Sequence, residues 1–222
     1  MNLNKKKIFL LILAFIVGLY IYRNFIEKNT ENDVLTVKRE NYKERLANNE
    51  IKKAHTFDEK YNIYTNSYYN ISFDGPDNWD TDFGIGDKSI YRTYDKKNGI
   101  TFKILVDEFE KEQTKYYNSW SFYGENKERY EKTMRNQISK GKGYNFSFER
   151  GMIRNNPTIK TTCNYKIKSI NKETEFQFIS HMTFGKKFIH SFGLVLPKKI
   201  YDNDKIKYEE FFNNVYFLKD KE

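Results

Sequence analysis

An uncharged apolar run near the N-terminus constrains this chain more than any other feature. Residues 8–22 (IFLLILAFIVGLYIY) carry no charge and lie between three lysines at residues 5–7 and Arg23. A bilayer-spanning helix needs roughly 20 apolar residues, whereas the core of a signal peptide needs only ~7–15. Extension of the run to Ile26 gives nineteen positions. The sequence therefore predicts a transmembrane anchor over residues 8–26.

Two alternatives to a retained anchor are a cleaved signal peptide and a buried helix. A cleavage site needs small residues after the apolar core, but residues 20–25 (YIYRNF) are mostly bulky. A lipoprotein needs a cysteine directly after the run, and the single cysteine of the chain is Cys163. We therefore expect the apolar segment to be retained as a signal anchor.

The distribution of basic residues predicts the orientation of this anchor. Three lysines precede the run, whereas only Arg23 and Lys28 follow closely, and basic residues favour the cytoplasmic side. Residues 1–7 are expected in the cytoplasm, and the C-terminal domain outside it, at the cell membrane of a bacterial envelope. A single cysteine is compatible with an oxidising compartment without demonstrating one.

The net charge of +9 does not predict nucleic-acid binding. Residues 1–30 hold five basic residues and one acidic residue, a net +4 that membrane topology explains. The remaining +5 is spread over 192 residues rich in both signs, without the dense basic stripe of a nucleic-acid interface. The aromatic content of 18% argues against disorder, because aromatic rings need burial. We therefore expect a folded domain that binds no nucleic acid.

A densely charged segment follows the anchor. Between residues 31 and 60, seven acidic and seven basic residues cancel, and the apolar stripe is thin. This pattern predicts a polar helical stalk or linker over residues 27–65, helical from about 33 to 53. A globular domain is expected over residues 66–222.

The pattern within the globular part alternates between strand and helix periods. Strands are predicted over 69–73, 100–106, 144–148, 158–169, 176–184 and 188–196, and helices over 125–140 and about 203–218. On the first helix Tyr130, Met134 and Ile138 share one face, and the second carries an apolar stripe. This order predicts an α+β fold, an antiparallel β-sheet flanked by helices.

The strand predicted over 158–169 has the clearest alternation. Every second residue from Ile159 to Ile167 belongs to a core face. The opposite face carries lysines, which at a sheet edge would prevent pairing with the strand of another chain. The following hairpin contains Gly185-Lys186-Lys187, and its apolar pattern favours a three-residue loop over a two-residue one.

The opening segment 69–79 (YNISFDGPDNW), together with this element order, resembles the PsbP/Mog1-like domains. The resemblance covers about 66–220 in layout. It implies a helix packed against an antiparallel sheet and a binding or scaffolding role, because members of that superfamily are mostly non-enzymatic adaptors or envelope proteins. It transfers no functional residue to this chain.

The three histidines do not predict a metal site. His55 lies in the predicted linker and is expected to be solvated. His181 and His190 would face each other across a two-residue turn, whereas the favoured three-residue loop places them on opposite faces. Even when paired, two histidines lack the third ligand that a zinc site usually needs. Cys163 lies on the core face of its strand and is expected to be a buried, inert thiol.

Two acidic clusters are candidate functional sites. The first lies in a turn whose composition is similar to that of calcium-binding loops, but an EF-hand register fails at Phe83 and Ser89, so a solvated turn is favoured over a looser calcium site. The first cluster consists of Asp77, Asp80, Asp82 and Asp87. The second consists of Asp107, Glu108, Glu110 and Glu112 and is expected to be an exposed strand end. Trp79 and Trp120 are expected to be core or rim anchors, and the paired glycines at 84/86 and 141/143 to be turns.

The sequence assigns no catalytic, cofactor-binding or metal-binding residue and implies no cofactor. It predicts a single-pass membrane protein whose extracytoplasmic domain binds or scaffolds a protein partner in the envelope without catalysis. The alternative is an extracytoplasmic hydrolase that uses the acidic clusters. A deep recess lined by two or more of Asp77, Asp80, Asp107 and Glu108 would favour that alternative.

Overall fold

The computed structural model describes residues 55–83, 89–108, 118–140, 143–169, 172–184 and 187–218. The predicted anchor (8–26) and stalk helix (33–53) lie outside these residues, so both remain predictions. Among the helices of the described ranges, none is both long and apolar enough to cross a bilayer.

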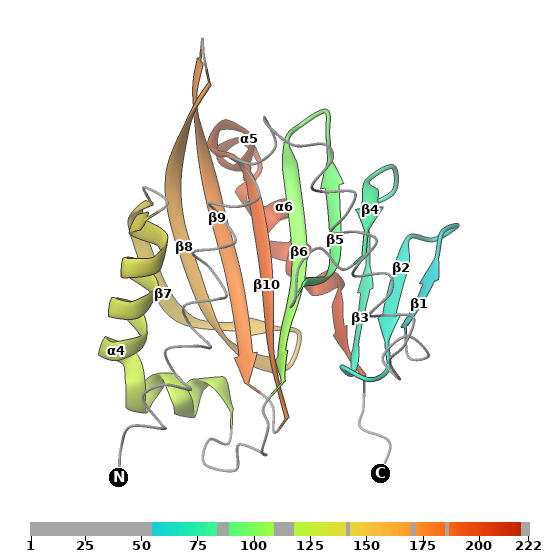
Figure 1. Cartoon of the computed structure of the whole chain (residues 1–222), viewed down its shortest axis with the longest axis horizontal. Coiled ribbons are helices and arrows are strands. Elements are labelled where there is room, and N and C mark those ends of the chain that lie inside the picture. The colour runs from blue at the N-terminus through green and yellow to red at the C-terminus, as the bar shows by residue number, and fades with distance from the viewer. Residues whose placement is uncertain are drawn as a thin grey trace.

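A seven-stranded antiparallel sheet forms the body of the domain (Figure 1). Its order is β4 (Asp80–Asp82), β5 (Ser89–Asp95), β6 (Ile100–Glu108), β10 (Phe188–Pro197), β9 (Lys172–Phe184), β8 (Asn156–Ser169) and β7 (Tyr144–Ile153). The strands predicted from period-two alternation all lie in this sheet, apart from residues 69–73. The antiparallel α+β architecture is thereby confirmed.

A second sheet of four short strands packs beside the β4–β6 end of the first. Its order is β1 (His55–Asp58), β2 (Ile63–Asn66), β3 (Ile71–Asp74) and β11 (Val215–Phe217). The first two strands fall within the predicted linker, so the globular part begins earlier than residue 66. Their four-residue length explains the error, since so short an alternation is hidden among charged neighbours.

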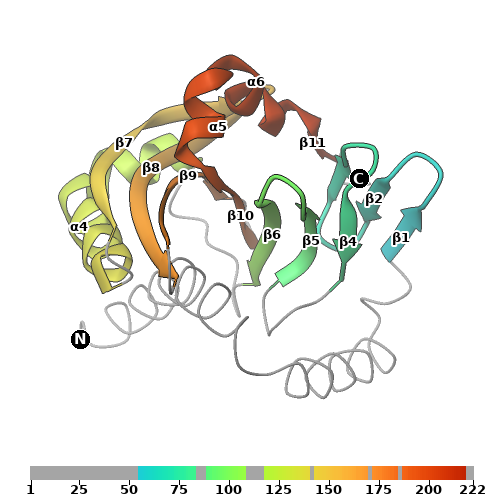
Figure 2. The same cartoon turned by 90° about the horizontal axis from the view of Figure 1, so that it is seen from above.

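Helices cover both faces of the large sheet (Figure 2). On one side lies α4 (Ser119–Lys140), which contains the predicted helix 125–140 and a non-helical residue at Asn126. It begins earlier than predicted because the Asn118 side chain accepts hydrogen bonds from the Trp120 and Ser121 amides at 3.0 and 3.1 Å, an N-cap. On the other side lie the short helices α5 (Lys198–Asn203) and α6 (Lys205–Glu210).

The C-terminal segment differs from the single predicted helix over 203–218. Its apolar stripe is buried as expected, but the backbone changes conformation three times. A break at Asp204 separates α5 from α6, a 3₁₀ turn η3 (Phe211–Asn214) follows, and the chain then extends as β11. The reason is tertiary: β11 pairs antiparallel with β3, and strand pairing overrides the helical period there.

Two hydrophobic cores lie on opposite faces of the large sheet. One lies between this sheet, the small sheet and α5–α6, and it includes Phe73 and Phe102, whose ring centroids are 4.5 Å apart. The other lies under α4, where Tyr130, Met134 and Ile138 are buried, as their spacing predicted.

The predicted core face of strand β8 is confirmed, but the predicted role of its lysines at a sheet edge is wrong. Its core face packs under α4, but its opposite face is partly covered, and Lys160 forms ion pairs with Glu149 at 3.1 Å and Glu209 at 2.6 Å. The lysine row does not guard an edge, because β8 lies between β9 and β7; β7 is the edge strand of the described sheet.

Cys163 is fully buried in the α4 core, as predicted, and burial raises the pKa of its thiol to about 12. We expect a disulfide reagent to label Cys163 on the order of a hundredfold or more slowly in the native protein than in denaturant, because the thiolate forms only after opening. A Ser147→Cys variant on the exposed edge strand serves as control and is expected to gain one rapidly labelled thiol. Rapid labelling of native Cys163 would contradict this burial.

Candidate functional site

The histidines of the β9–β10 hairpin lie on one face, which corrects the expected three-residue loop. Phe184 pairs with Ile189, so four residues separate the paired positions. In this register His181 pairs with Phe192 and His190 with Thr183, which places both histidines diagonally on the same face. The apolar pattern of the strands alone therefore did not give the register.

Each of these histidines is buried with a partner of its own. His190 donates from Nε2 to the Tyr69 carbonyl at 2.8 Å, and His181 shares a hydrogen bond between Nδ1 and Thr158 Oγ1 at 2.9 Å. Burial lowers the pKa of each ring to about 4, so both are neutral at pH 7. In the described part of the chain, no group of three His, Cys, Asp or Glu side chains is arranged to hold a metal ion.

His55 is not a solvated linker residue. It lies in β1, and its ring centroid is 5.0 Å from that of Tyr64 and 4.7 Å from that of Phe83. Burial lowers its pKa below the ordinary value. Its aromatic contacts therefore belong to the packing of the small sheet.

The structure separates the acidic residues near β4. Asp82 forms an ion pair with Arg92, and Asp80 Oδ2 lies 3.1 Å from Lys96 Nζ. That contact raises the pKa of Lys96. Asp77 lies apart on an exposed loop, and Asp87 lies outside the described residues. The described members of this cluster thus do not gather around one point.

The second acidic cluster is only partly described. Asp107 is 7% exposed, which corrects the prediction that this strand end is exposed. The Glu108 side chain, Glu110 and Glu112 lie outside what the structure describes. No paired carboxylate site can be built from the described acids of this cluster.

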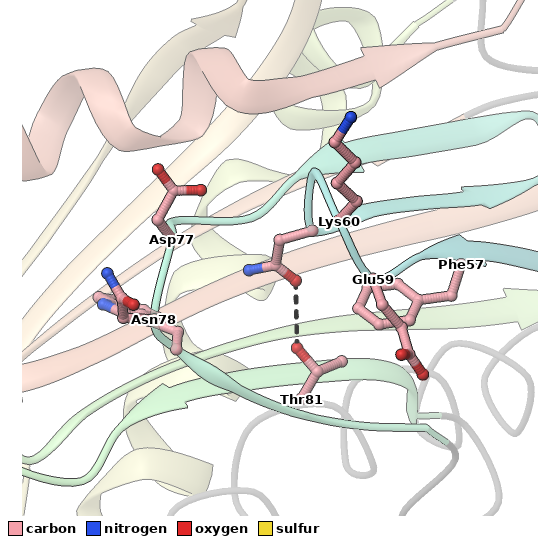
Figure 3. Close-up of a pocket in the computed structure, with 8 residues that line it drawn as sticks. Phe57, Glu59, Lys60, Asp77, Asn78 and Thr81 are labelled. Atoms are coloured by element: carbon pink, nitrogen blue, oxygen red, sulfur yellow. Dashed lines mark hydrogen bonds between the residues drawn. The ribbon is translucent and has the colours of Figure 1, made fainter.

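A recess opens between the β1–β2 loop and the segment that leads from β3 into β4 (Figure 3). Its volume is about 610 Å³. The lining combines aromatic, amide, hydroxyl and charged side chains: Phe57, Glu59, Lys60, Asn62, Asp77, Asn78, Trp79 and Thr81. We call it the hairpin recess. Sequence reasoning missed its first four residues because they fall within the predicted linker.

Asn62 joins the two walls of the hairpin recess. Its carbonyl accepts from the Gly75 amide at 2.8 Å, and its Nδ2 donates to the Pro76 carbonyl at 2.5 Å. Its Oδ1 accepts from Thr81 Oγ1 at 3.3 Å (dashed line in Figure 3). Asn62 has φ 51°, a left-handed conformation that asparagine tolerates better than most residues. These contacts connect the two walls of the recess through one residue.

The loops on either side of Asn62 are also ordered by local hydrogen bonds. Asp58 Oδ1 accepts from the Lys60 and Tyr61 amides at 3.0 and 3.3 Å, which closes the β1–β2 loop. The segment after β3 forms a turn, in which the Trp79 amide donates to the Pro76 carbonyl at 3.4 Å and Asn78 has φ 65°, whereas Asp80 and Asp82, expected in a solvated turn, lie in strand β4. Aspartate and asparagine favour such turns because their side chains bond to nearby backbone amides.

Both tryptophans are packed anchors, as predicted. The Trp79 ring stacks on Phe211 with a centroid distance of 5.5 Å and an interplanar angle of 23°. Trp120 Nε1 donates to the Gly151 and Thr158 carbonyls at 3.0 and 3.1 Å, which ties the start of α4 to the β7–β8 hairpin. Of the two, Trp79 lines the hairpin recess.

The charged groups of the hairpin recess do not converge. In Figure 3 the carboxylates of Asp77 and Glu59 extend from separate loops in different directions, and the Lys60 ammonium points away from both. Acid–base catalysis needs two titratable groups held around one reacting bond. This arrangement suits contact with a ligand from several sides better than proton transfer.

Gly75→Ala is expected to destabilise the protein by about 1–3 kcal/mol, because overpacking forces neighbouring atoms to move. An added Cβ would lie 2.5 Å from Asn62 Nδ2 and 2.8 Å from its Cγ, so the walls of the recess would separate. Urea unfolding measures the change. Gly124→Ala is the control: its Cβ would meet Arg150 Nη2 at 3.5 Å, an ordinary contact, and a small stabilisation is expected in a helix. Equal stability of the Gly75→Ala and Gly124→Ala variants would contradict this role of Gly75.

Comparison with known proteins identifies the fold. No model of a known protein family matches the sequence, and no curated protein sequence matches it either. The solution structure of cyanobacterial PsbP (CyanoP) from Synechocystis sp. PCC 6803 is similar, with 13% identity, 70% of this chain and 91% of that chain covered, and a TM-score of 0.50. A crystal structure from Bacteroides thetaiotaomicron VPI-5482 matches at 14% identity, with 69% and 47% covered and a TM-score of 0.42. The similarity to cyanobacterial PsbP shows that the domain has a PsbP-like fold, as the opening segment and the element order predicted, and at 13% identity the likeness extends to the fold alone.

Proposed function

We propose that this protein is a single-pass, membrane-anchored binding protein whose extracytoplasmic α+β domain holds an envelope partner without catalysis. Three features support the proposal: the uncharged run of residues 8–22 with its extension to 26, the PsbP-like fold, and the hairpin recess. The partner expected from this scaffolding role is a protein of the envelope. The recess is the surface at which the domain contacts it.

The shape of the hairpin recess is the observation that carries this proposal. Its walls are joined through Asn62, so binding would not have to order the loops first. Tyr61, which lies in the chain between the lining residues Lys60 and Asn62, is 56% exposed, and tyrosine is enriched in interfaces. A preformed recess lined by aromatic and polar side chains suits recognition of another molecule.

The distribution of acids favours binding over the hydrolase alternative. Of the four acids that would identify a hydrolytic recess, only Asp77 lines this one. Asp80 forms its ion pair with Lys96, whose side chain is 67% exposed, and Asp107 is buried in β6. A two-carboxylate mechanism would require a second converging acid.

Photo-crosslinking in intact cells tests the contact surface. A photoreactive amino acid in place of Glu59, at the exposed rim of the recess, is expected to give one discrete adduct. The same replacement at Lys132, on the exposed face of α4 at the far end of the sheet, is the matched control and is expected to give none (Figure 1). Adducts of equal yield at both positions, or at neither, would contradict the proposal.

A reporter fusion tests the membrane orientation independently of the partner. A reporter that is active only outside the cytoplasm, fused after Glu222, is expected to be active. A fusion that is active only with a cytoplasmic reporter would refute the extracytoplasmic placement.

A further inference from the structure

We infer that the hairpin recess binds a neutral saccharide unit, through a tryptophan surface surrounded by amide and carboxylate groups. This inference rests on the proposed function: the saccharide is a glycan carried by the envelope partner, and it is the group that the recess recognises. The size of the recess, its aromatic surface, its hydrogen-bonding groups and its charge all support it.

The size of the recess fits a short oligosaccharide. Its volume of about 610 Å³ lies within the range of roughly 300–1,000 Å³ that is typical of small-molecule sites. The recess is open to solvent between two loops, so a ligand that continues beyond it, as a glycan chain does, can leave without obstruction.

Two aromatic side chains form the apolar part of the lining. Trp79 lines the recess, and its stacking on Phe211 holds the ring in place. Phe57 lines the recess from the β1 side and packs on Phe83 at a centroid distance of 5.0 Å. The electron-rich face of an aromatic ring attracts the weakly positive C–H groups that one face of a pyranose presents.

The polar lining matches hydroxyl groups. Asn78 offers both an amide donor and a carbonyl acceptor, and Glu59 and Asp77 offer acceptors only. A sugar hydroxyl donates and accepts at once, so it can bond to each of these groups. The Asn62 amide is already used in joining the walls, which leaves the rim residues to contact the ligand.

Charge distinguishes a neutral saccharide from other ligands. A phosphorylated or otherwise strongly anionic ligand would meet the carboxylates of Glu59 and Asp77. A polycationic peptide would meet Lys60 at the same recess and the net charge of +5 that residues 31–222 carry. Because charges of both signs line the recess, a strongly charged ligand of either sign would meet a like charge, which favours a ligand without net charge.

Calorimetric titration of the full-length protein tests the inference. The chain is purified in a detergent without a sugar headgroup and titrated with neutral hexose and N-acetylhexosamine tetrasaccharides. We expect one saturable site for at least one of them. Trp79→Ala is expected to weaken binding about tenfold or more, since it removes the stacking surface, and Asp77→Asn is expected to weaken it by a smaller factor. Lys132→Ala on α4 is the control, with unchanged affinity.

Three further probes identify the source of the saccharide and the competing ligand classes. A glycosylated peptide and the same peptide without its glycan test a glycoprotein source, and sedimentation with insoluble cell-wall polysaccharide tests a polymer source. Tetralysine and inorganic phosphate are expected not to compete. Binding of the unglycosylated peptide or of phosphate at the recess, with loss in Trp79→Ala, would overturn the saccharide assignment.

The outcomes separate this inference from the proposed function. Absence of saturable binding to all neutral saccharides, with a specific crosslink retained at Glu59, would overturn the saccharide inference and leave the binding role intact. Absence of both would overturn both. Circular dichroism of Trp79→Ala establishes that the variant is folded, and Trp79→Phe, which keeps a ring on Phe211, is expected to recover part of the affinity.

Discussion

Acidification from pH 6.5 to 4 is expected to lower the free energy of unfolding by several kcal/mol. His181 and His190 are buried and neutral, and burial lowers the pKa of each from 6.5 to about 4. Between these values the unfolded chain binds protons that the folded protein excludes, so each ring costs up to about 3 kcal/mol of stability. Above pH 6.5 the full stability is present; it is lost as the pH falls toward 4.

The charged groups near His181 act on its pKa in opposite directions, and burial remains the largest cause. His181 lies near Lys160, whose charge further lowers the histidine pKa, and near Glu209, whose charge acts in the opposite direction. Burial acts to raise the pKa of Glu209, but its bonds to Lys160 and Tyr201 lower it overall, so this carboxylate also favours the folded state above the acidic range. The lowered pKa of Glu209 keeps its ion pair with Lys160 until the pH falls below the ordinary carboxyl range.

Urea unfolding at several pH values measures this dependence. His190→Gln keeps a donor for the Tyr69 carbonyl and removes the titrating ring. The number of protons taken up on unfolding between pH 6.5 and 4 is therefore expected to fall by about one, which makes the free energy of unfolding less dependent on pH. His55→Gln is the comparison, with a smaller effect because that ring is only partly buried. A free energy of unfolding that does not change between pH 7 and 4.5 would show that the buried rings titrate normally.

Phe73→Ala is expected to destabilise the protein by about 3–5 kcal/mol, the cost of an emptied aromatic site in a core. Phe73 of β3 stacks on Phe102 of β6 with an interplanar angle of 21°, and both rings are fully buried. Each ring also contacts Phe211, at 5.7 and 5.2 Å. This aromatic group joins the small sheet, the large sheet and the C-terminal segment, so the cavity would lie where three elements meet.

A double-mutant cycle checks the stacking directly. Phe73→Ala and Phe102→Ala are expected to be non-additive by about 0.5–1.5 kcal/mol, because each substitution removes the same ring contact. Tyr61→Ala is the control: its side chain is 56% exposed, and a change within about 0.5 kcal/mol is expected. A loss of less than about 1 kcal/mol in Phe73→Ala would contradict the role of this ring in joining the sheets.

Local periodicity was sufficient for the long elements of this fold. Period-two alternation identified β6 and β8, and the spacing of Tyr130, Met134 and Ile138 identified the buried face of α4. In each element one face is buried along many residues, so the pattern repeats often enough to be read without a partner. The buried position of Cys163 followed from the same alternation.

The candidate site was much less predictable. Asp77 and Trp79 stand out in the sequence as members of a turn, but Glu59, Lys60 and Asn62 fall within the predicted linker. Nothing in that local pattern shows that Asn62 bonds across to the segment after β3. The recess depends on contacts between segments that are separated in sequence, and such contacts leave no period to detect.

The sequence by itself determined the apolar run near the N-terminus, the charge balance, the α+β class and the buried faces of the long strands and of α4, because these depend on residue type and local spacing. Only the tertiary structure decided the β9–β10 register, the conversion of the C-terminal helix into α6, η3 and β11, and the joining of β1–β2 to the loop at Gly75. Each of those depends on which backbone groups find partners across the fold, and the free energy of that pairing exceeds local propensity.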